Sequence, residues 1–100
     1  MKRENKKKDI ESFRKYIKKH HTGIDNVITC KDLHRHFKIS EATVREYVVK
    51  LRKNGTPICS CRFGYYYPEN HTDVMETVTR FNKYLLTLSA TSSDMLRARI

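Results

Sequence analysis

Apolar residues near the start of the chain recur at the spacing of a helix. Ile10, Phe13 and Ile17 follow one another at i, i+3 and i+7, so they share one helical face. The amphipathic pattern begins at Asp9, and Gly23 suits its end because glycine accepts the left-handed conformation of a C-cap. The spacing therefore predicts a first helix from about residue 9 to residue 21.

The middle of the chain predicts two short helices joined by a tight turn. Thr29 is a good N-cap for a helix over residues 30–37, and Ser40 is one for a helix over residues 41–53. Residues 24–28 have room for a very short strand before them. The apolar faces of the two helices consist of Leu33, Phe37, Val44, Val48 and Leu51.

The pattern changes after Gly55. Residues 56–67 carry β-branched or aromatic residues at both ends, with a short loop between them, and Pro68 follows. This arrangement predicts a β-hairpin with its tip near residues 61–63. Since alternate strand residues point the same way, Tyr65 and Tyr67 should share one face of the hairpin.

A last helix is predicted to begin near Thr72. Its apolar residues follow one another at spacings of 4, 3, 4 and 3, which is typical of a coiled-coil stripe. We expect residues 89–93 to be poor in helix. The stripe consists of Val74, Val78, Phe81, Leu85 and Leu88.

These elements together predict a mainly α fold with a small β-hairpin (α+β), namely a winged helix-turn-helix followed by a C-terminal helix. We expect a basic arm over residues 1–8, the winged helix-turn-helix over 9–68, and a helical segment over 69–100. The arm could follow phosphates or enter a minor groove, or it could be a solvated tail. The last helix could pack back on the domain; we favour pairing with a second copy, which makes the protein a homodimer.

Positive charge is concentrated in the first half of the chain. The net charge is +10, and residues 1–53 hold 16 Lys or Arg against 7 Asp or Glu, whereas residues 54–100 hold 5 against 4. A solubilising surface charge is one explanation, but the asymmetry favours a polyanionic partner, double-stranded DNA before an anionic membrane.

The outward face of the 41–53 helix carries the candidate DNA contacts. Arg45 could make a bidentate contact to guanine and Glu46 could accept from cytosine, while Ala42 and Thr43 could touch a thymine methyl or a phosphate. Arg62 lies at the hairpin tip, as a phosphate or minor-groove contact or as a solvated turn residue. The expected DNA-contacting residues are Thr29, Ser40, Glu41, Ala42, Thr43, Arg45, Glu46, Lys50, Arg52, Lys53 and Arg62.

Residues 40–67 resemble the winged-helix domains of the biotin-repressor type. Those domains run Ser-x-x-(Ala/Thr)-(Val/Ile), then Leu-Arg-x-x-Gly, a short strand and Gly-Tyr. The matching residues are Ser40, Thr43, Val44, Leu51, Arg52, Gly55, Ile58, Gly64 and Tyr65. The resemblance extends over about residues 10–68 and implies DNA binding through the third helix and a wing. Where a ligase domain would follow, the sequence predicts a single helix, so we expect no biotin chemistry.

Other chemistry finds little support in the sequence. Cys59 and Cys61 flank one residue and His71 is near, but no second ligand pair follows at zinc-finger spacing. The three cysteines therefore indicate reduced thiols, and we expect no metal and no cofactor. There is no nucleophile with a base and no glycine-rich phosphate loop, so we expect no enzyme. Without a signal peptide or a membrane-spanning run, a cytoplasmic location is expected.

The leading hypothesis is a homodimeric, sequence-specific transcriptional regulator of phage or bacterial type that binds double-stranded DNA. One alternative is a replication or excision accessory protein that bends or marks DNA. Another is a protein-interaction module in which the last helix docks on a partner protein.

Overall fold

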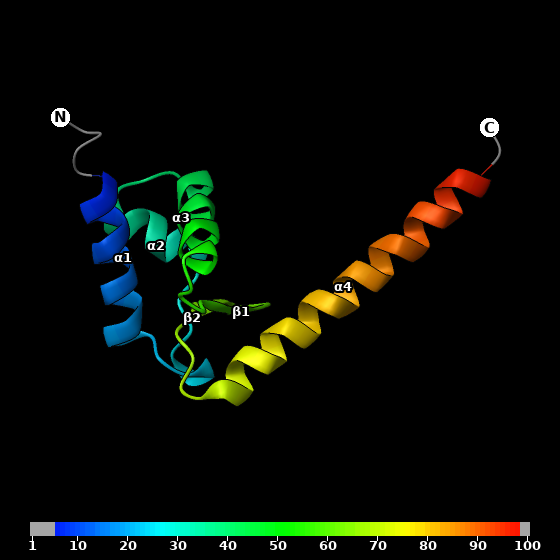
Figure 1. The fold of residues 1–100 in the computed structure, drawn as a ribbon. Coiled ribbons are helices and arrows are strands. Elements are labelled where there is room, and N and C mark those ends of the chain that lie inside the picture. The colour runs from blue at the N-terminus through cyan, green and yellow to red at the C-terminus, as the bar shows by residue number, and fades with distance from the viewer. Residues whose placement is uncertain (1–5, 99–100) are drawn as a thin grey trace.

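The computed structural model describes residues 6–98 and contains four α-helices and a two-stranded antiparallel sheet (Figure 1). A mainly α fold with a small β-hairpin is therefore confirmed. The elements are α1 (Lys6–His20), the 3₁₀ turn η1 (Ile24–Asn26), α2 (Cys30–Phe37), α3 (Glu41–Lys53), β1 (Cys59–Cys61), β2 (Gly64–Tyr66) and α4 (His71–Arg97).

The bounds of α2 and α3 are those that the capping residues predict. The Thr29 hydroxyl accepts a hydrogen bond from the Asp32 backbone N–H at 3.0 Å. The Ser40 hydroxyl accepts one from the Thr43 N–H, also at 3.0 Å. Between the helices Lys38 adopts the left-handed conformation with φ 56°. The caps and this one residue turn the chain from α2 into α3.

The hydrophobic core lies between α1, α2, α3 and the hairpin. The Phe13 ring packs edge-on against Tyr47 at 5.3 Å between centroids and lies 5.4 Å from Phe37. Tyr66 reaches the core region from the hairpin and is fully buried. The other members of the core cluster are Ile17, Ile28, Leu33, Val44, Val48, Leu51 and Ile58.

The hairpin pairs Cys59 with Tyr66 and Cys61 with Gly64, which leaves a two-residue turn at its tip. Ile28 forms a bridge to β2, since its N–H donates to the Tyr65 carbonyl at 2.9 Å and its carbonyl accepts from the Tyr65 N–H at 2.8 Å. The strand expected within residues 24–28 is thus reduced to this one bridge, because η1 takes up the residues before it.

Two helix boundaries differ from the prediction. α1 begins at Lys6 rather than Asp9, because lysine is a good helix former and Asp9 already lies in the first turn. The proposed arm therefore overlaps α1, and residues 1–5 lie outside the described residues.

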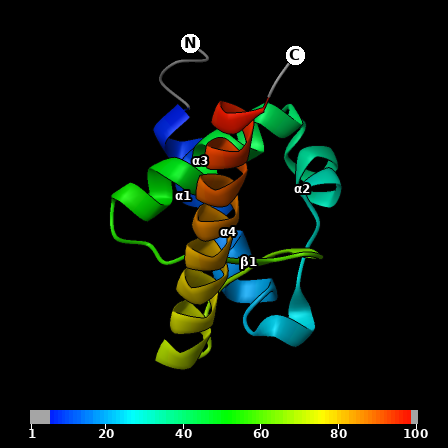
Figure 2. The ribbon, with the colours of Figure 1, turned by 90° about the vertical axis from the view of Figure 1, so that its right-hand side faces the viewer.

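α4 continues through residues 89–93, where a helix-poor segment was expected. That expectation was wrong, because serine and threonine cost an exposed helix only about 0.5 kcal/mol each relative to alanine. The 27 residues of α4 rise about 40 Å. Figure 1 shows that α4 projects away from the rest of the molecule as a single straight helix, and in Figure 2 the same helix stands in front of the other elements.

Candidate nucleic-acid interface

The face of α3 opposite the core is open and basic. Val44, Tyr47, Val48 and Leu51 are buried on the inner side, so the residues on the opposite side of the helix point outward. Val49 adds an apolar spot that is 47% exposed. The outward residues line a shallow hollow and are Ala42, Arg45, Glu46, Val49, Lys50 and Lys53. Five of these six were expected from the sequence; Val49 was not among the expected contacts.

Arg45 is exposed and only weakly held. Its guanidinium lies 4.0 Å from the Cys30 sulfur, a long contact that leaves most of its donors open to solvent. Burial raises the pKa of the Cys30 thiol, so the sulfur does not form an ion pair with Arg45 near neutral pH. Arg45 can therefore turn toward a ligand without losing a strong interaction.

Several of the expected contact residues serve local structure. The Thr29 and Ser40 hydroxyls hold the N-caps of α2 and α3. The Thr43 hydroxyl lies 2.8 Å from that of Ser40, and the Glu41 carbonyl accepts a hydrogen bond from the Cys30 thiol at 3.7 Å. The hydroxyls of Thr29, Ser40 and Thr43 and the Glu41 carbonyl therefore already have hydrogen-bond partners.

Arg52 points away from the outward face of α3 and ties the helix to the hairpin. Its Nε donates to the Ile58 carbonyl at 2.9 Å and a terminal nitrogen donates to the Ser60 hydroxyl at 3.3 Å. Its guanidinium also lies 5.1 Å from the centre of the Phe81 ring. Burial lowers the pKa of Arg52, although the group stays charged. The Arg52 side chain thus braces the hairpin against α3, and its bonded nitrogens are not free to bind a phosphate.

Arg80, a residue of α4, binds the same strand β1. Its Nε and one terminal nitrogen both donate to the Ser60 carbonyl, at 3.1 and 2.5 Å, and that nitrogen also reaches the Tyr66 hydroxyl at 3.3 Å. The hairpin is thus bonded to α3 and to α4 at one residue, Ser60. The sequence did not single out Arg80, because an arginine on a helix carries no sign of its tertiary partner.

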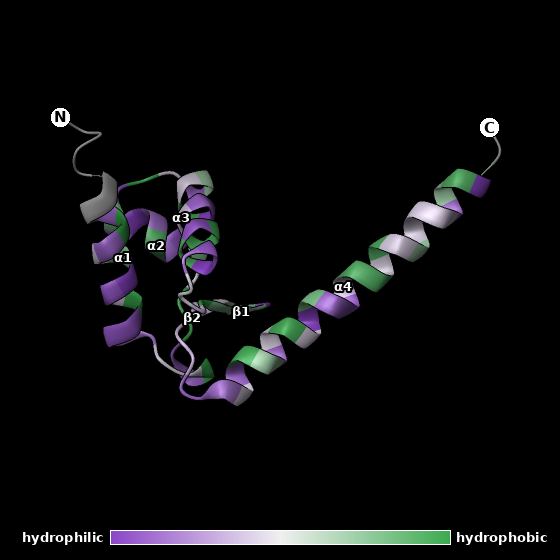
Figure 3. Ribbon diagram, in the orientation of Figure 1, coloured by the Kyte–Doolittle hydropathy of each residue, from purple (hydrophilic) through white to green (hydrophobic). Residues whose placement is uncertain are grey.

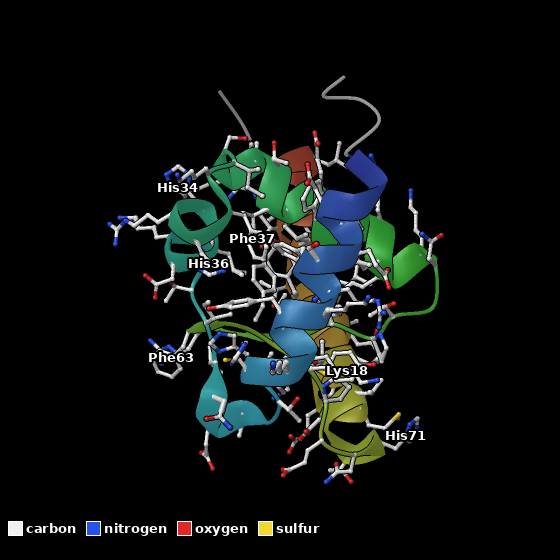
Figure 4. The ribbon with its side chains drawn as sticks, turned by 90° about the vertical axis from the view of Figure 1, so that its left-hand side faces the viewer. Lys18, His34, His36, Phe37, Phe63 and His71 are labelled. Atoms are coloured by element: carbon white, nitrogen blue, oxygen red, sulfur yellow. The ribbon has the colours of Figure 1, made fainter. Side chains whose placement is uncertain are left out.

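The hairpin tip carries Arg62 and Phe63. Both side chains are exposed, and the Arg62 guanidinium lies 5.6 Å from the Phe63 ring centre. A groove runs between this tip and the start of α2, where it is bordered by Thr29 and Lys31. Figure 4 shows Phe63 standing out from the body. Lys31 and Phe63 were not among the residues expected from the sequence. An aromatic residue at the tip of the predicted hairpin was the signal that could have pointed to Phe63.

The expected apolar stripe of α4 is divided between two environments. Val74, Val78 and Phe81 line a hollow with Ile58 and Cys59, so this part of α4 packs against its own chain. From Phe81 to residue 98 every side chain is exposed, Leu85 and Leu88 included. Apolar residues continue along this free part of the helix, as Figure 3 shows.

Three of the five histidines, His20, His21 and His36, lie around the Tyr16 ring. His36 stacks on Tyr16 with ring centres 4.2 Å apart, at the seam of α1 and α2, while His34 and His71 point elsewhere (Figure 4). Within residues 6–98, no three His, Cys, Asp or Glu side chains come together as a metal site would require. No helix in that range has the length and apolar character needed to cross a membrane.

Comparison of the chain with protein-family models, with curated proteins and with solved structures gave no match.

Proposed function

We propose that this protein is a winged-helix protein that binds double-stranded DNA, with α3 in the major groove and the hairpin as its wing. The observation that carries the proposal is the open basic face of α3 beside a hairpin fixed by Arg52 and Arg80. A reading helix and a wing can contact one duplex together only if their relative position is set, and these two struts set it. The positive charge of residues 1–53 adds the attraction to phosphate.

The residues on α3 divide into base-reading and phosphate-binding sets. Arg45 and Glu46 lie in the N-terminal half, where a recognition helix approaches base edges, and they suit guanine and cytosine. Ala42 and Val49 supply apolar contact for a thymine methyl. Lys50 and Lys53 lie nearer the C-terminal end and are assigned to phosphates.

The free part of α4 supports a homodimer. Most helical stability in proteins comes from packing of an apolar face, and an exposed apolar face favours association. One stripe of this segment, continuous with Phe81, holds Tyr84, Leu85, Leu88, Met95 and Leu96. The segment has few charges, with Arg97 paired to Asp94 at 2.8 Å, so two copies do not repel strongly. We therefore propose that a second copy covers this stripe.

A dimer carries two α3 helices and would read two half-sites. Such an assembly fits a small transcriptional regulator, the role we favour. The free α4 stripe also suits a second candidate function, a protein-interaction module in which another protein covers α4. Salt dependence separates the two, because phosphate contacts weaken steeply as salt rises and apolar contacts do not.

Selection from a random pool of duplexes, followed by sequencing, tests DNA binding, with single-stranded DNA as control. We expect an enriched inverted repeat bound in a salt-sensitive way. Arg45→Ala should then weaken binding to the selected site by about 1–3 kcal/mol and relax the preference at one base pair. Salt-sensitive binding without an enriched motif would favour an accessory role in replication or excision. Absence of any binding would contradict the proposal and favour the interaction module.

Two neighbouring leucines test the dimer. Leu85 lies on the α4 stripe and Leu86 lies on another face, and their side chains are 61% and 72% exposed. Leu85→Glu should yield a monomer in sedimentation equilibrium because it places a charge in the apolar contact. Leu86→Glu adds the same charge outside the contact and should leave the dimer intact. A wild-type protein that sediments as a monomer at all concentrations would contradict the dimer.

A further inference from the structure

Phe63 stands apart from the other exposed apolar residues of the body. Before α4, the large exposed apolar side chains are Ile24 at 48%, Val49 at 47% and Phe63 at 68%. Phe63 is the most exposed of the three and lies at the outermost point of the hairpin (Figure 4). A two-residue turn does not need an aromatic ring, since small and polar residues serve there better.

The base of the hairpin holds Phe63 in a fixed position. On one edge, Ile28 exchanges two backbone hydrogen bonds with Tyr65. On the other, Arg52 and Arg80 bind the Ile58 and Ser60 carbonyls at 2.9 and 3.1 Å. An apolar group carried on a strand pair braced at both edges loses little conformational freedom on binding, so its insertion into a partner costs little.

The surroundings of Phe63 favour an anionic partner. The Arg62 guanidinium lies against the ring, and Lys31 borders the groove between the tip and α2. An apolar contact surface for a protein would not be expected to hold three cations, whereas Lys31, Arg52 and Arg62 line this groove together with Tyr65 and two cysteines. A single apolar wedge flanked by cations is the arrangement found where proteins enter the minor groove and unstack a base step.

We propose that Phe63 inserts between two base pairs in the minor groove next to the sequence read by α3, and thereby kinks the duplex. Arg62 then binds a phosphate beside the opened step. This inference rests on the proposed DNA-binding function and deepens it, because it makes the wing a bending device as well as a contact. It also predicts a preference for flexible pyrimidine–purine steps at the position of the wing.

End-to-end energy transfer in a dye-labelled duplex that holds the selected site measures the bend. We expect the wild-type protein to bend this duplex by about 20–90°. Phe63→Ala should abolish most of the bend while the protein stays bound at saturating concentration. Ile24→Ala removes another exposed apolar side chain of the body and should leave the bend unchanged. Arg62→Ala should keep the kink and lower the salt slope of binding by about one.

A 2-aminopurine placed at successive positions under the wing locates the wedge. Unstacking raises its fluorescence, so we expect one bright position with the wild type that is lost in Phe63→Ala. A wild-type complex with straight, fully stacked DNA would overturn the wedge and leave DNA binding standing. An unchanged bend in Phe63→Ala would overturn it as well. Failure of the wild type to bind any duplex would instead overturn the proposed function.

Discussion

The body of the molecule and the free part of α4 are built from similar amphipathic patterns, yet they end in opposite states. In α1 the residues at helical spacing, Phe13 and Ile17, are fully buried by α3 and its neighbours. In α4 the same kind of spacing leaves Leu85 and Leu88 exposed. The difference is that three other elements surround the α1 stripe, whereas α4 is in contact with its own chain only up to Phe81.

The comparison shows that a hydrophobic stripe predicts burial but not the identity of the partner. Burial within one chain needs other elements packed against the helix, whereas the side chains of α4 from Phe81 to residue 98 are exposed. The first half of the stripe lies against the hairpin, where Arg80 of α4 donates to the Ser60 carbonyl, although Val78 and Phe81 stay 40% and 41% exposed. The second half of the stripe is exposed.

The largest difference in the free energy of unfolding should come from truncating one apolar side chain in the core and one in the free part of α4. Ile17→Ala should lower the free energy of unfolding by about 2–5 kcal/mol, because it leaves a cavity in a closed core. Leu96, at 87% exposed, should show almost no effect on truncation in urea unfolding at low protein concentration. A comparable loss at both sites would show that the free helix is packed as firmly as the body.

A backbone substitution tests how rigidly the hairpin joins the body. Gly64 has φ +144°, and a Cβ there would overlap the Ile28 carbonyl, so Gly64→Ala should cost about 2–3 kcal/mol. Gly55 also has a positive φ, +94°, but a Cβ there meets nothing within 4 Å, and its substitution should cost about 1 kcal/mol. Thermal unfolding measures both; an equal cost would mean that the bridge at Ile28 does not restrain the hairpin.

Substitutions of two neighbouring cations at the end of α3, Arg52 and Lys53, should have different effects on stability and on DNA binding. Arg52→Ala should lower the free energy of unfolding by about 1.5–3 kcal/mol, because it removes the hydrogen bonds to the carbonyl of buried Ile58 and to the Ser60 hydroxyl. Lys53→Ala should leave stability unchanged and lower the salt slope of DNA binding by about one. If Arg52→Ala instead lowered only the salt slope of DNA binding and left the free energy of unfolding unchanged, Arg52 would be a phosphate contact.

The smallest effect is expected from single hydroxyls. Ser40→Ala removes the cap of α3 and should cost about 1 kcal/mol, measured by urea unfolding. Thr91→Ala in the free part of α4 removes a hydroxyl where no cap is needed, and should be neutral or slightly stabilising because alanine is the better helix former. A loss at Thr91 equal to that at Ser40 would point to a partner for the Thr91 hydroxyl.

Much of the fold could be predicted because its signals are local. Thr29 and Ser40 fix where α2 and α3 begin, through hydrogen bonds to residues three positions away. The candidate face on α3 follows from helical geometry once Val44, Val48 and Leu51 are taken as the inner side. The prediction that residues 89–93 interrupt the last helix failed because weak local preferences do not outweigh helix propagation.

The sequence alone determined the elements, the inward and outward faces of α3 and the concentration of positive charge, since each depends on neighbours along the chain or on composition. Only the tertiary structure decided that Arg52 and Arg80 are struts, that Phe63 is presented at a braced tip, and where α4 leaves its own chain. Those facts depend on residues 6 to 20 positions apart, and an arginine or an aromatic residue carries the same chemistry whether it meets solvent, its own backbone or a ligand.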